Sequence, residues 1–109
     1  MIVKNIFIKD KCYEIVIGQN AKENDILIKE SHPLDLWFHL SNVPSAHLVL
    51  RSKGDKIPRR YINEVSGMLF ENNKKYMGNT NVIYTEIRNV KRTDVPGRVI
   101  TRKVETIRF

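Results

Sequence analysis

The side chains best suited to chemistry gather in residues 35–51, which hold the single tryptophan of the chain and two of its three histidines. Imidazoles and carboxylates are ligands for zinc and for harder divalent ions, and they also act as general acids and bases. The side chains of interest are Asp35, Trp37, His39, His47 and Arg51. Whether they can act together depends on the backbone that positions them.

Two runs of alternating strand-like residues, 36–40 and 46–51, flank a turn that contains Pro44. Side chains alternate across a strand, so every second residue shares a face. Symmetric closure of the turn gives the cross-strand pairs Leu40–Ala46, His39–His47, Trp37–Val49 and Asp35–Arg51. The sequence therefore predicts a hairpin with one apolar core face and one mixed polar and aromatic face.

The histidines on the mixed face could in principle bind a metal ion or act as acid–base catalysts. A metal held by His39 and His47 needs a third ligand, Asp35 or His32, but strand residues four apart are separated by about 13 Å. Catalysis would require a nucleophile or a metal together with a phosphate clamp, and the hairpin offers only turn serines. We therefore expect no catalytic residue, metal or cofactor. The histidine pair then serves either sheet hydrogen bonding or direct contact with nucleic acid.

The rest of the chain reads as further hairpins interrupted by two helices. A helix over residues 21–30 is predicted by Asn20 as its cap and Glu23 at the capping-box position. A second helix is predicted to begin at Pro58 and to close at Lys74–Lys75. Further strands are predicted at residues 2–8, 12–17, 81–87, 98–101 and 104–108, with a polar connection over 89–97. The order β-β-α-β-β-α-β-β-β predicts a single α+β domain over 1–109, with a mostly antiparallel sheet and the helices on one side of it.

Charge is distributed unevenly along the chain, whose formal net charge is +7. Residues 1–50 hold five cations and six anions, whereas residues 51–109 hold 14 cations and six anions, and more than half of these cations are arginines. Arginine pairs with phosphates and stacks on bases, so this half has the footprint of a polyanion binder. Arg59 and Arg60 fall in the first turn of a predicted helix, where the helix dipole disfavours cations, and they mark a candidate anion site.

Composition narrows the class of protein. The hydrophobic fraction of 41% and the charged fraction of 28% are typical of globular proteins. No apolar run approaches the ~20 residues that span a membrane, and no signal-peptide pattern is present. The single cysteine, Cys12, excludes an internal disulfide and a cysteine-based zinc cluster. We expect a cytoplasmic protein without a membrane partner.

Several sequence blocks resemble the NFACT-R family, the domain that ends the NFACT proteins of ribosome-associated quality control. The hairpin segment 35–51 matches its signature. Further blocks of the same order lie at residues 17–25, 81–85, 89–92 and 96–99. The resemblance covers roughly residues 12–108. It implies binding of nucleic acid, chiefly RNA in a ribosomal context, and no direct chemistry.

These observations predict an RNA-binding domain whose partners are tRNA, ribosomal RNA or a ribosomal subunit. Phosphate contacts are expected from cations, and any selectivity from the rings of the hairpin. The predicted interface comprises Asp35, Trp37, His39, His47, Arg51, Lys53, Arg59, Arg60, Arg88, Lys91, Arg92 and Arg98. Three alternatives stay open: a double-stranded DNA binder, a phosphodiester-cleaving enzyme that uses the histidines, and an adaptor for an acidic protein. The sequence leaves the oligomeric state open.

Overall fold

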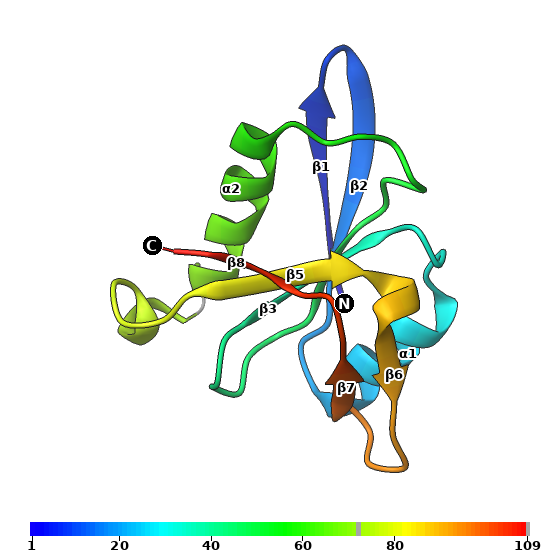
Figure 1. The fold of residues 1–109 in the computed structure, drawn as a ribbon, viewed down its shortest axis with the longest axis vertical. Coiled ribbons are helices and arrows are strands. Elements are labelled where there is room, and N and C mark those ends of the chain that lie inside the picture. The colour runs from blue at the N-terminus through cyan, green and yellow to red at the C-terminus, as the bar shows by residue number, and fades with distance from the viewer. Residues whose placement is uncertain (72, 109) are drawn as a thin grey trace.

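The computed structural model describes residues 1–71 and 73–108. The strands are β1 (Ile2–Ile8), β2 (Lys11–Ile17), β3 (Leu36–Leu40), β4 (Leu48–Leu50), β5 (Val82–Glu86), β6 (Val90–Arg92), β7 (Val99–Thr101) and β8 (Glu105–Ile107). The helices are α1 (Ala21–Glu30) and α2 (Arg59–Gly67), with 3₁₀ turns at Met68–Phe70, Lys74–Tyr76 and Ile87–Asn89. Within the described residues, β1-β2-β4-β3-β5-β8 form one antiparallel sheet, and β6 pairs with β7 separately (Figure 1).

The predicted α+β fold with a mostly antiparallel sheet is confirmed, with one added strand. That strand, β6, lies in the segment that was predicted to be a polar connection. It is short and two of its three residues are exposed cations, so it lacks the alternation that predicts a strand. It forms because Val90 packs in a buried cluster with Leu27 and Ile28 of α1.

The two helices cover opposite faces of the large sheet, so the prediction that both lie on one side is wrong. Ile62 and Val65 of α2 share a buried cluster with Phe38, whereas α1 packs in a second cluster with Trp37. Trp37 and Phe38 are adjacent in β3 and therefore point to opposite faces. Each is at most 1% exposed, so both faces of this strand need a cover.

The helix boundaries show what local sequence controls. α1 begins as predicted, because the Asn20 side chain accepts a hydrogen bond from the Glu23 backbone N–H at 2.9 Å. α2 ends at Gly67 and continues only as a 3₁₀ turn, well before the predicted end at Lys75. Glycine is a weak helix former, and the 3₁₀ turn seats Leu69 and Phe70 in the core. Among the described residues, no helix has the length and apolar character that crossing a membrane requires.

Candidate nucleic-acid interface

The central hairpin adopts the predicted register. Trp37 pairs with Val49 across β3 and β4, between the flanking pairs of Leu36 with Leu50 and of Phe38 with Leu48. The same register brings the rings of His39 and His47 to 4.9 Å between centroids, edge to face. The mixed face of the hairpin is therefore real, although it is largely covered by the cluster that contains α1 and β6.

Trp37 and His47 form a buried polar pair on this face. They are 1% and 2% exposed, and the indole Nε1–H of Trp37 donates to Nδ1 of His47 at 3.1 Å. The backbone N–H of His47 donates to the Asn24 side chain at 3.2 Å. Burial, assisted by the neighbouring His39, lowers the pKa of His47 to about 3. His47 is therefore neutral near pH 7 and carries its proton on Nε2, because Nδ1 accepts from the indole.

His39 is also fixed in orientation but remains half-buried. Its Nδ1 lies 2.6 Å from the carbonyl oxygen of Leu40, and a carbonyl only accepts, so Nδ1 carries the proton. The ring stacks on Trp37 with 5.5 Å between centroids and 9° between planes. Burial lowers the pKa of His39 below its usual value. The neutral ring is left with an unprotonated Nε2 that can accept a hydrogen bond.

Asp35 lies inside the fold and organises the loop after the hairpin. Its carboxylate is 0% exposed and accepts from the backbone N–H groups of His32 at 3.0 Å and Lys53 at 2.9 Å. The Arg51 guanidinium lies 4.0 Å from Asp35 and 3.2 Å from Glu14. Arg51 is thus largely neutralised by its neighbours, while the exposed Lys53 side chain projects from the loop that Asp35 holds.

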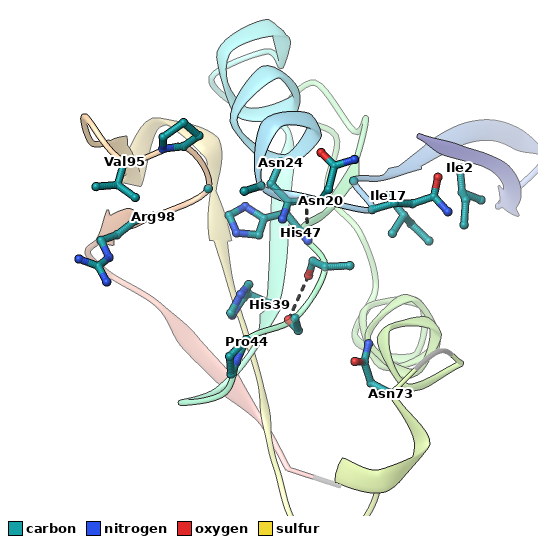
Figure 2. Close-up of a pocket in the computed structure, with 17 residues that line it drawn as sticks. Ile2, Ile17, Asn20, Asn24, His39, Pro44, His47, Asn73, Val95 and Arg98 are labelled. Atoms are coloured by element: carbon teal, nitrogen blue, oxygen red, sulfur yellow. Dashed lines mark hydrogen bonds between the residues drawn. The ribbon is translucent and has the colours of Figure 1, made fainter.

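A cleft of about 780 Å³ opens beside the two histidines (Figure 2). We call it the histidine cleft. Its walls come from the start of α1, the turn before β4 and the loop before β7. They include Asn20, Asn24, His39, Pro44, Ser45, His47, Pro96, Gly97 and Arg98. Gly97 (φ +81°) lets its loop approach α1 so closely that a Cβ atom there would lie 3.1 Å from Cα of Ala21.

The predicted cations divide into paired and unpaired groups. Arg88 pairs with Glu86 at 2.8 Å, and Arg92 makes two hydrogen bonds to Asp25 at 2.9 and 2.8 Å. The Arg92 guanidinium also holds the pKa of Asp25 below its usual value. In the described part of the chain, Lys91 and Arg98 form no ion pair and both are exposed.

A second groove, of about 400 Å³, runs over the β6–β7 hairpin. Arg88, Lys91 and Arg102 line it together, and we call it the basic groove. Sequence reasoning had omitted Arg102 and its neighbour Lys103 from the interface, although both belong to the cation-rich second half. Arg102 joins Arg88 and Lys91 in the groove because the unexpected strand β6 pairs with β7.

Arg59 and Arg60 lie apart from this basic groove. They start α2, which has no side-chain cap and no acidic residue in its first turn. Arg60 donates to the hydroxyl of Tyr61 at 2.7 Å and lies 4.6 Å from the centre of its ring. The start of α2 and the β6–β7 hairpin stand at opposite ends of the view in Figure 1. The predicted cations therefore lie in at least two separate parts of the fold.

The side chains that were candidate third ligands for a metal ion make other hydrogen bonds instead. Asp35 is occupied by backbone N–H groups, and Nδ1 of His32 accepts from the Leu34 backbone at 3.0 Å. Over residues 1–71 and 73–108, no group of three or more histidine, cysteine or acidic side chains is arranged to hold a metal ion. The predicted interface omits several residues of the histidine cleft, among them Asn24, a buried polar residue of α1.

Known proteins share both the sequence pattern and the fold. The model of the NFACT protein RNA binding domain matches residues 4–103. Coiled-coil domain-containing protein 25 is 36% identical over 92 residues in Bos taurus and in Mus musculus, covering 79% of this chain and 44% of each relative. The Danio rerio protein of that name is 36% identical over 87 residues, covering 74% of this chain and 42% of its own length. This chain thus spans less than half the length of these relatives.

A solved structure has the same fold. The C-terminal part of the fibronectin/fibrinogen-binding protein from Streptococcus suis superposes with a TM-score of 0.79 at 20% identity, covering 97% of this chain and 44% of that one. At this identity the likeness establishes the fold alone. The family match, the sequence blocks and the unpaired cations together support a nucleic-acid-binding role. The chain belongs to the NFACT protein RNA-binding domain family.

Proposed function

We propose that this protein binds RNA in the cytoplasm and engages tRNA, ribosomal RNA or a ribosomal subunit during translation quality control. It acts by binding and not by catalysis. The observation that carries the proposal is the basic groove, where Lys91 and Arg102 stand exposed without an acidic partner among the described residues. Together with family membership, this arrangement fits a surface that follows a phosphate backbone.

The groove has the chemistry that such binding needs. Exposed guanidinium and ammonium groups gain from a polyanion because their contacts release condensed counterions. The Arg88 guanidinium already pairs with Glu86. Of the three cations in the groove, Lys91 and Arg102 therefore gain the most free energy from contact with a phosphate. The affinity of such binding for RNA falls steeply as the salt concentration rises. A surface that docks only an acidic protein would show no affinity for RNA.

The test is fluorescence anisotropy with tRNA, a random RNA and duplex DNA at 50 and 200 mM salt. We expect salt-sensitive binding that is tightest for tRNA or another structured RNA. Tighter binding to duplex DNA would favour the DNA-binding alternative. Absence of binding to every probe at 50 mM salt would refute the proposal and favour an acidic protein partner.

Replacement of the unpaired cations tests whether the basic groove binds RNA. Replacing Lys91 and Arg102 with Gln should reduce the log–log salt slope by about two phosphate contacts, or ~1.4–1.8. The matched control replaces Lys9 and Lys56, two exposed lysines outside the groove, and should leave the slope within about 0.5 of the wild-type value.

The start of α2 is tested in the same way. Replacing Arg59 and Arg60 with Gln should also reduce the slope by ~1.4–1.8 if RNA extends to this helix. An unchanged slope would exclude the start of α2 from the interface and confine RNA to the β6–β7 side.

A further inference from the structure

The histidine cleft has the size and the lining of a site for a small polar group. Its volume of about 780 Å³ falls in the range of roughly 300–1,000 Å³ that is usual for ligand pockets. No described residue that lines it is acidic, and Arg98 is the cation among them. The electrostatic balance at its mouth therefore favours an anionic or neutral ligand over a cation.

The floor of the cleft presents a defined hydrogen-bonding pattern. Nδ1 of His39 is committed to the Leu40 carbonyl, so its Nε2 is an acceptor. Nδ1 of His47 accepts from the Trp37 indole, so its Nε2 carries a proton and lies near the Gly97 backbone. Of the two rings, His39 is the one that remains half-exposed, and it offers an acceptor held rigid by stacking on Trp37.

Trp37 itself cannot serve as a stacking platform, since it is 1% exposed and its ring is sandwiched in the core cluster. The selective contact must therefore come from the side chain that Trp37 supports. Figure 2 shows His39 between His47 and Pro44, with Arg98 across the cleft. This places an acceptor on one wall and a guanidinium, suited to a phosphate, on another.

From this arrangement we infer that the histidine cleft binds one unstacked nucleotide of single-stranded RNA, which donates a hydrogen bond to Nε2 of His39 and presents its phosphate to Arg98. The inference rests on the proposed function and names the substrate class for this part of the surface. The donor is either the ribose 2′-hydroxyl or an N–H group on the base edge. A base inside a duplex is stacked and paired, so it cannot enter such a cleft.

The test compares a single-stranded RNA 10-mer with the blunt 10-base-pair RNA duplex that it forms with its complement, by anisotropy at one salt concentration. The variant His39→Phe keeps an aromatic ring over Trp37 but removes the acceptor. We expect it to weaken binding of the single strand about 3- to 10-fold and to leave the duplex affinity unchanged, as befits one lost hydrogen bond. The matched control, His32→Phe, removes an imidazole outside the cleft and should change neither affinity.

A second measurement guards against a folding defect in the variant. In the wild-type protein labelled with ¹⁵N, the Nε2 resonance of His39 should shift when the single strand is added, because that atom becomes a hydrogen-bond acceptor. A DNA 10-mer of the same sequence identifies the donor: loss of the shift points to the 2′-hydroxyl and its retention to the base.

The outcomes separate this inference from the proposed function. Equal effects of His39→Phe on single strand and duplex, or a His39 resonance unmoved by bound RNA, overturn the inference and leave RNA binding intact. Failure of the wild-type protein to bind any RNA at low salt overturns both.

Discussion

Replacing Trp37 with Phe tests the buried hydrogen bond that orders the site. The change removes the Nε1–H that donates to His47 at 3.1 Å and leaves the imidazole Nδ1, in a ring only 2% exposed, without a donor. An unsatisfied buried polar group costs about 1–3 kcal/mol. The smaller ring also leaves a cavity in the cluster around Val49 and Leu27, which lowers the free energy of unfolding by about a further 1 kcal/mol. The free energy of unfolding should fall by about 2–4 kcal/mol.

Urea denaturation followed by far-UV circular dichroism measures this loss, since the variant has no tryptophan fluorescence. Trp37→Ala should cost ~3–5 kcal/mol or more. RNA affinity of the Phe variant, measured where it and the wild-type protein are folded, should stay within about twofold, because Trp37 has no exposed surface for a base. A double-mutant cycle with His47→Leu should show a coupling of about 1 kcal/mol or more. A Phe variant of wild-type stability that loses RNA binding would refute this reasoning and make Trp37 a contact residue.

Three further predictions follow from buried or paired groups. Burial lowers the pKa of His47 from 6.5 to about 3, so the unfolded chain takes up this proton first, and stability falls as pH drops from 6.5 towards 3. Between pH 6 and 5 the loss should be about 1 kcal/mol, and His47→Gln should remove it in parallel urea titrations. Gly97→Ala should lower the melting temperature, at a cost of about 1–2 kcal/mol, because φ is +81° and the new Cβ would press on Ala21; an unchanged melting temperature would contradict this packing. Asp25→Asn should release Arg92 and steepen the RNA salt slope by ~0.7–0.9, whereas an unchanged slope would place Arg92 outside the interface.

The central hairpin was predictable because its signals are local. Alternation fixes which side chains share a face, and the turn around Pro44 fixes the pairing of Trp37 with Val49. The cap of α1 was predictable for the same reason, since Asn20 and Glu23 lie within one turn. The α+β class followed from the order of these elements.

The features that escaped prediction depend on contacts between distant segments. β6 consists of Val90 and two cations and has no strand pattern of its own. It forms because β7 pairs with it and α1 covers Val90. The placement of the helices on opposite faces likewise follows from the sheet having two apolar sides, a property that one strand at a time does not reveal.

The sequence by itself determined the hairpin register, the excess of cations in residues 51–109 and the family to which the chain belongs. Only the tertiary structure decided which of those residues face solvent. Packing of α1 and β6 on the mixed face buries Trp37 and His47 and leaves His39 at a cleft. An ion pair with Asp25, which is distant in the sequence, neutralises Arg92, while Lys91 and Arg98 form no ion pair among the described residues. The physical reason is that burial and charge pairing are set by segments far apart in the chain, which local patterns do not encode.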